Sequence, residues 1–132
     1  MASLRSQFLP CEIGGVLVGY FDFNNGENTL NIVDAMPPPP GSIGTPSCFI
    51  RKGGQELANI IQDVRTRTMG IVSYIGEWHS HPDGHSTKQS SDDAFQIKCI
   101  AEHMNQDGLP GIQIIVGEGG YNIYLGDETN DC

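Results

Sequence analysis

The segment from residue 13 to residue 23, IGGVLVGYFDF, constrains the fold of this chain more than any other. It is apolar and β-branched, and it contains glycines but no proline, which is typical of a buried β-strand. Residues 24–26, Asn-Asn-Gly, favour a turn because both residue types tolerate positive φ. Residues 29–36 then predict the returning strand of a hairpin. Pro37 ends that strand, because proline supplies no N–H to a ladder.

The rest of the chain alternates between helical and extended patterns. Residues 53–67 place apolar side chains on one face of an amphipathic helix. A second helix is predicted to begin at Ser90 or Ser91, with acidic residues in its first turn, and to run to about residue 105 with Phe95 among its apolar positions. The remaining predictions are a loop over 37–47, a short strand over 48–51, strands over 71–78, 111–116 and 121–125, and a polar loop over 79–89. This order predicts an α/β or α+β sandwich, a sheet with helices packed on it.

Composition limits the size and the partners of the protein. A chain of 132 residues predicts a single domain spanning 1–132. The formal net charge of −9, from 16 acidic and 7 basic residues, repels phosphate backbones and anionic lipid, which argues against nucleic-acid or membrane partners. The sequence has no apolar run near the roughly 20 residues that span a bilayer. Its four scattered cysteines resemble neither a disulfide framework nor a zinc clip, and we expect a cytoplasmic protein.

Three of the four histidines cluster, at positions 79, 81 and 85. Two histidines at i and i+2 at the end of a strand point to the same side. His79 and His81 therefore form half of a tetrahedral zinc site, and the acidic helix start after residue 90 offers a carboxylate as a further ligand. Taken alone, the two histidines could instead be exposed, or hydrogen-bonded to neighbouring groups, without binding a metal. The chain has no HExxH, no H-x-E with PCxxC and no CxxC, so three other zinc patterns are absent.

Two separated motifs resemble one family. The sequence His79-Ser80-His81-Pro82, followed by Ser90-x-x-Asp93, is similar to the JAMM motif of MPN-type zinc isopeptidases. Upstream, residues 12–19, EIGGVLVG, resemble the E-x-G-G-x-L-x-G strand of the same family. The resemblance extends from about residue 10 to residue 125 and agrees with the predicted order of elements.

The resemblance implies a function and roles for particular residues. It implies a cytidine-deaminase-like mixed sheet flanked by helices, with one catalytic Zn²⁺ held by His79, His81 and Asp93. Glu12 would act as general base and acid on the zinc-bound water, and Ser90 would help to hold the tetrahedral intermediate. The substrate would be the amide at the C-terminus of a ubiquitin-like protein. Activating and conjugating enzymes would be partners, as in bacterial antiphage systems.

Two further readings remain open. One is an MPN scaffold without activity, and the other is a zinc peptidase acting on small or cell-wall peptides. Because only 11 residues precede Glu12, we expect a domain shortened at its N-terminus or taken from a larger protein.

The spacing of the JAMM-like motif departs from the family pattern. Residues 83–89 separate the proline from Ser90, one residue more than is commonest in the family. Strict counting would make Asp92 the ligand, but Gln89 would then occupy the serine position. We favour Asp93, because a loop accommodates an insertion more easily than a helix start does.

The neighbouring side chains have simpler expected roles. Trp78 points away from His79 in a regular strand, so we expect it in the core. His85 is expected to be a solvated loop residue and His103 a surface residue of the second helix.

Overall fold

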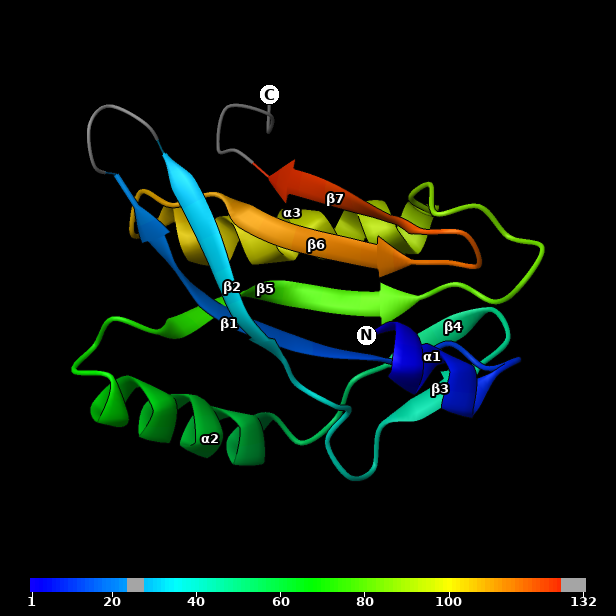
Figure 1. Cartoon of the computed structure of the whole chain (residues 1–132), viewed down its shortest axis with the longest axis horizontal. Helices are drawn as coiled ribbons and strands as arrows, with labels where there is room; N and C mark the ends of the chain where they lie inside the picture. Colours follow the sequence, from blue (N-terminus) through cyan, green and yellow to red (C-terminus); the bar gives the residue numbers. More distant parts are fainter. Residues whose placement is uncertain (24–27, 127–132) are drawn as a thin grey trace.

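The computed structural model describes residues 1–23 and 28–126. Within this part of the chain three helices and seven strands follow the predicted order, with additions at the N-terminus and in the proline-rich segment (Figure 1). The turn predicted at 24–26 lies outside the described residues. The elements are α1 (Ala2–Phe8), β1 (Gly14–Asp22), β2 (Thr29–Ala35), β3 (Ile43–Thr45), β4 (Cys48–Ile50), α2 (Gly54–Arg67), β5 (Ser73–Ser80), α3 (Ser91–Asn105), β6 (Gly111–Val116) and β7 (Tyr121–Gly126).

Five strands form one twisted mixed sheet in the order β2-β1-β5-β6-β7. β1 pairs with β2 and with β5 in antiparallel fashion, β5 and β6 are parallel, and β7 returns antiparallel to β6. The parallel pair needs a crossover connection, which α3 provides. A separate small sheet contains only β3 and β4. The α+β architecture expected from the sequence, a sheet with helices packed on it, is confirmed.

The central strand β5 continues further than the sequence predicted. We expected a strand over 71–78 followed by a loop from His79, but β5 runs from Ser73 to Ser80. His79 pairs with Gly14 of β1, and Ser80 pairs with Val116 of β6. Pairing with β1 and β6 on both sides holds these two polar residues in extended conformation. The strand therefore continues past residue 78, where the sequence becomes polar and a loop was predicted.

Two short elements were not predicted. The helix α1 occupies the N-terminal residues, for which the sequence pattern gave no prediction. The proline-rich segment expected to be a loop contains β3, which forms a tight hairpin with β4. A three-residue strand is too short to show an alternation of polar and apolar side chains, so its pattern is hidden in the sequence.

The core lies on the face of the sheet to which α1, β2 and β4 contribute side chains. Trp78 is 1% exposed there, as expected from its position beside His79, and its indole N–H donates to the Met36 carbonyl at 2.9 Å. Burial of the strand predicted over 13–23 is confirmed for the first six residues of β1. The buried cluster consists of Ile13, Leu17, Ile75, Trp78, Ile112, Ile114 and Val116.

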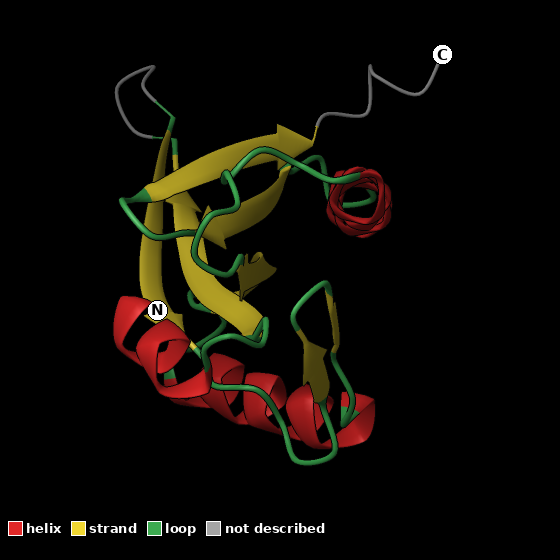
Figure 2. Cartoon of the chain, turned by 90° about the vertical axis from the view of Figure 1, so that its right-hand side faces the viewer, coloured by secondary structure: helices red, strands yellow, loops and turns green. Residues whose placement is uncertain are grey.

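The two longer helices pack beside the central strands (Figure 2). α3 packs against β6 and β7, and α2 packs against β5. Ile100, Ala101 and Met104 of α3 are buried, as the apolar pattern predicted. Phe95 is 70% exposed, so its assignment to the apolar face was wrong, because the helix turns that position away from the sheet. Among the described residues, no helix has the length and apolar character needed to cross a bilayer.

Replacing Trp78 with alanine tests the weight of this core. We expect Trp78→Ala to lower the free energy of unfolding by about 3–5 kcal/mol, because the change leaves a large cavity and an unpaired carbonyl at Met36. Urea denaturation followed by far-ultraviolet circular dichroism measures the loss. A loss below about 1 kcal/mol, typical of a surface substitution, would contradict the packing described here.

Candidate active site

The ladder between β1 and β5 brings the two sequence motifs together. The Ile13 N–H donates to the Ser80 hydroxyl oxygen at 3.0 Å, and the Ser80 N–H donates to the Ile13 carbonyl at 2.7 Å. These partners are 67 positions apart in the sequence. Glu12, which precedes Ile13, is thereby carried to the end of β5, where the histidines lie.

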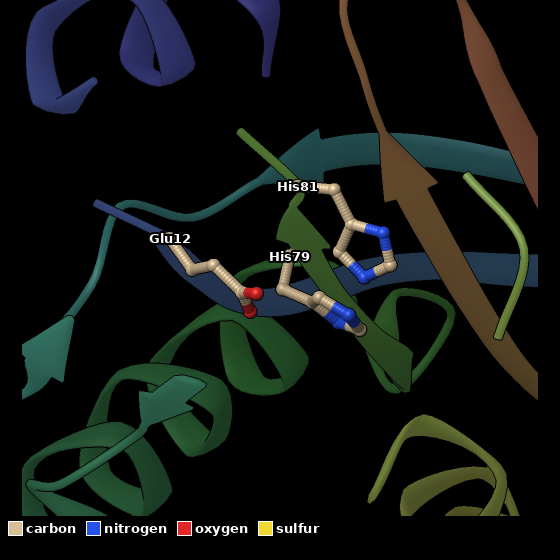
Figure 3. A group of neighbouring side chains, drawn as sticks. All are labelled: Glu12, His79 and His81. Carbon is tan, nitrogen blue, oxygen red and sulfur yellow. The ribbon is translucent and has the colours of Figure 1, made fainter. Parts of the chain in front are cut away.

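Glu12, His79 and His81 form a compact group that could hold a metal ion. One ligand atom from each lies within 4.8 Å of the other two. Both histidines are buried and Glu12 is partly buried. Figure 3 shows the Glu12 carboxylate and both imidazole rings directed toward the same space.

Asp93 lies against both histidines. Its Oδ1 is 2.8 Å from His79 Nε2, and its Oδ2 is 3.0 Å from His81 Nε2. Asp93 is buried in the first turn of α3, whereas Asp92 is exposed. Of the two carboxylates considered from the sequence, the structure therefore brings Asp93 to the histidine pair.

The helix start itself fixes the Asp93 side chain. Ser90 is the N-cap of α3, and its Oγ accepts from the Asp93 N–H at 3.2 Å. Asp93 Oδ2 accepts from the Ser90 N–H at 2.9 Å, which completes a capping box. The same carboxylate therefore caps the helix and faces the histidines.

The Nε2 atoms of both histidines face Asp93 and fit a metal. His81 Nδ1 lies 2.6 Å from the Ser86 carbonyl, an acceptor that requires a proton on Nδ1 and leaves the Nε2 lone pair available. His79 Nε2 is buried beside Asp93, yet no group among the described residues gives it a hydrogen bond. A buried polar atom without a well-formed hydrogen bond is costly, and a cation between the two Nε2 atoms and the carboxylate would satisfy it.

The charges in the group shift its pKa values. Burial acts to raise the pKa of Asp93, but the two imidazoles and the Ser90 N–H outweigh it and hold that pKa well below its usual range. The hydrogen bond to Asp93 raises the pKa of His81 against the effect of burial. Burial raises the pKa of Glu12, although the neighbouring histidines act to lower it. A carboxyl with a raised pKa is suited to accepting and returning a proton near neutral pH.

Ser90 stands at the rim of the group. Its side chain is exposed, and its only role on α3 is that of cap acceptor for the Asp93 N–H. Accepting this bond occupies a lone pair of the hydroxyl oxygen and leaves the hydroxyl hydrogen to be donated elsewhere.

The small β3–β4 hairpin contacts the backbone of Glu12. The Glu12 N–H donates to the Thr45 carbonyl at 2.8 Å. A Cβ placed on Gly44 would lie 2.1 Å from the Glu12 carbonyl oxygen, so a side chain at this position would displace the Glu12 backbone. The hairpin that the sequence did not predict is thus part of what positions Glu12.

A comparison with curated proteins gives one similar protein. Over 115 residues the chain is 32% identical to a protein of Enterobacter hormaechei subsp. hoffmannii (strain UCI 50) described as a CD-NTase/cGAS isopeptidase. The match covers 85% of this chain and 60% of the relative. The chain thus spans less than two thirds of the length of that relative. No family model matches the chain.

Sequence reasoning missed Arg5, a buried side chain of α1. Its Nε donates to the His81 carbonyl at 3.0 Å, and its Nη2 bonds the Asp83 carboxylate. The guanidinium therefore holds the backbone of His81 and the start of the following loop. A single basic residue in a helix of 7 residues carries no signal that could have identified it.

A groove of about 510 Å³ lies between α2 and α3. Arg51 binds the Glu77 carboxylate at 2.6 and 3.2 Å, and Tyr74 donates its hydroxyl to Glu77 at 3.1 Å. Glu77 lies two positions before His79 on β5, so it marks the end of the groove nearest to the histidines. The groove lining includes none of the four residues that surround the candidate metal position.

The other two histidines are not members of the group, although the charge of His85 acts to lower the pKa of Glu12. His85 is exposed in the loop after Pro82, as expected. His103 is also exposed, near the C-terminal end of α3, where its ring makes an edge contact with Tyr74 at a centroid distance of 5.7 Å.

The bond between Arg5 and the His81 carbonyl can be tested by substitution. We expect Arg5→Met to lower the free energy of unfolding by about 1–3 kcal/mol, because a buried carbonyl loses its partner. Asp83→Asn is the matched control, since Asp83 is 57% exposed and its loss is expected to cost under about 1 kcal/mol. Equal effects in urea denaturation would show that the ion pair, rather than the carbonyl bond, carries the contribution of Arg5.

Proposed function

We propose that this chain is a metal-dependent isopeptidase that hydrolyses the amide at the C-terminus of a ubiquitin-like protein. The observation that carries the proposal is the convergence of His79, His81 and Asp93, with Glu12 facing the same space. Two imidazoles and one carboxylate leave a position open, which is the donor set of catalytic rather than structural zinc sites. The similarity to a protein described as an isopeptidase supports the same reaction class.

Zinc is the metal that we propose. Two imidazole nitrogens and one carboxylate oxygen suit zinc, and no thiolate is needed. When bound, zinc would polarise the scissile carbonyl and lower the pKa of a coordinated water toward neutrality. The carbonyl of Ser86 and the guanidinium of Arg5 would keep His81 in the tautomer and position that the site requires.

Glu12 and Ser90 act on the substrate in this proposal. The Glu12 carboxylate takes a proton from the attacking water and returns it to the departing amine, for which its raised pKa suits it. The Ser90 hydroxyl hydrogen donates to the oxyanion that develops on the scissile carbonyl. Ser90 and Glu12 come from different parts of the chain, the N-cap of α3 and the residue before β1.

The proposed substrate is a conjugate made by a bacterial ubiquitin-like system. The name of the relative supports a CD-NTase as the protein from which the ubiquitin-like partner is removed. Activating and conjugating enzymes of an antiphage system would then supply the conjugate. Two predictions from the sequence belong to the same proposal: residues 1–132 form a single JAMM-type domain, and the protein is cytoplasmic.

Metal analysis of the purified chain tests the centre of the proposal. We expect about one zinc per chain, and we expect His79→Ala to lose it because one of three protein ligands is gone. His103→Ala is the matched control, since this exposed histidine lies outside the group and its loss is expected to leave the zinc content unchanged. Equal zinc content in wild type and His79→Ala would contradict the proposed metal site.

Cleavage by a Glu12 variant tests the proton transfer. The probe is a ubiquitin-like protein fused through its C-terminal glycine to a reporter protein, with an isopeptide-linked conjugate alongside. We expect Glu12→Gln to keep zinc while cleavage falls by about 10²–10⁴-fold, the usual contribution of general acid–base catalysis. Wild-type activity in the Glu12→Gln variant would remove Glu12 from the mechanism.

The same assays separate the alternatives. A chain that holds zinc but cleaves neither probe, and instead cleaves short synthetic peptides, would be a zinc peptidase of a different substrate class. A chain that holds no zinc and cleaves nothing would be a scaffold.

A further inference from the structure

Gln113 is a polar residue in the most deeply buried strand of the sheet. Every residue of β6 is buried, and the residues that flank Gln113 are isoleucines. Gln113 itself is 0% exposed. Burying an amide away from water is unfavourable unless its donors and acceptor are satisfied, so its partners explain why the fold tolerates it here.

The three hydrogen bonds of Gln113 all reach the segment that contains the start of α3. Its Nε2 donates to the Asp93 carbonyl at 2.9 Å and to Gln96 Oε1 at 2.8 Å. Its Oε1 accepts from Gln89 Nε2 at 2.8 Å. One amide therefore joins the residue before the N-cap, the first turn and the next turn of the helix to a rigid strand.

We propose that Gln113 is a positioning residue for the candidate metal site. By holding the Asp93 carbonyl, it fixes the first turn of α3 so that the Asp93 carboxylate faces both histidines. This inference rests on the proposed function for its consequence, because Asp93 is one of the proposed zinc ligands. The placement of the helix start is a property of the metal-free chain and can be measured by itself.

The geometry distinguishes positioning from simple core packing. An apolar residue of similar size would fill the same volume. An apolar residue would lack the hydrogen bonds to Gln89 and Asp93, on either side of Ser90. These bonds hold the helix start from the neighbouring strand, whereas the capping box holds it from within. Partners that orient a metal ligand usually affect metal affinity by about 10–100-fold, far more than their contribution to packing alone would.

The test uses the full chain and the variant Gln113→Met, which keeps volume and removes both donors. Two controls are matched to it. Gln96→Met removes the bond between Gln113 and Gln96 and keeps the bond to Asp93, and Ile114→Val perturbs the neighbouring core position of the same strand. Gln113→Glu is the second variant if Gln113→Met fails to fold, because it keeps an acceptor for Gln89 and replaces the two N–H donors by at most one O–H donor. Circular dichroism identifies the folded variants.

Hydrogen exchange of the metal-free proteins is the first measurement. We expect the amides of Asp93 and Ala94, both of which donate to Ser90, to exchange faster in Gln113→Met than in either control. Amides near Met104, at the other end of α3, are expected to be unchanged relative to the Ile114→Val control. If Gln113→Met changed the exchange rates at the two ends of α3 by the same factor relative to the controls, the proposal would be overturned and Gln113 would be a packing residue.

Zinc titration of the same proteins is the second measurement. We expect the zinc dissociation constant to rise about 10–100-fold in Gln113→Met and to stay within about threefold of wild type in the controls. Wild-type affinity in Gln113→Met would overturn the positioning of Asp93 while leaving the proposed zinc site intact. Failure of the wild-type chain to bind zinc would instead reject the proposed function, and the exchange measurement would still decide the role of Gln113.

Discussion

The pairing of β1 with β5 is the interaction on which the rest of the site depends. Two hydrogen bonds between Ile13 and Ser80 join the residue before β1 to the last residue of β5. Backbone pairing in a sheet is rigid because each residue is held by neighbours on both sides, and β5 has such neighbours in β1 and β6. The relative position of Glu12 and the histidines is therefore set by main-chain geometry and does not rely on a flexible loop. Asp93 comes from α3, beyond the loop that follows His81, and the helix cap fixes it.

Much of this arrangement could be predicted from the sequence because it depends on local patterns. The apolar run of β1, the two amphipathic helices and the acidic start at Ser90 each carry their own signal. The choice of Asp93 over Asp92 as the carboxylate beside the histidines also followed from local chemistry, because a Ser-x-x-Asp capping box depends on its internal spacing and not on the length of the loop before it. The burial of Trp78 followed from strand alternation in the same way.

The supporting interactions could not be predicted because they join distant parts of the chain. Arg5 reaches His81 across 76 positions, and Gln113 reaches Asp93 across 20. Neither residue stands in a pattern that marks it as buried, since an arginine in a short helix and a glutamine in a strand are ordinary on a surface. The extension of β5 through His79 and Ser80 was hidden for the same reason. It depends on partners in β1 and β6, which a single strand sequence does not contain.

The capping box makes the three proposed ligands unequal in what their loss would cost the protein. Asp93 belongs to the start of α3, so a mutation that removes its carboxylate also removes the partner of the Ser90 N–H at the helix end. His79 takes no part in a helix cap, and its Nε2 faces Asp93 Oδ1 at 2.8 Å. A substitution at Asp93 would therefore disturb both the proposed metal position and the start of α3, whereas a substitution at His79 would leave the helix cap in place.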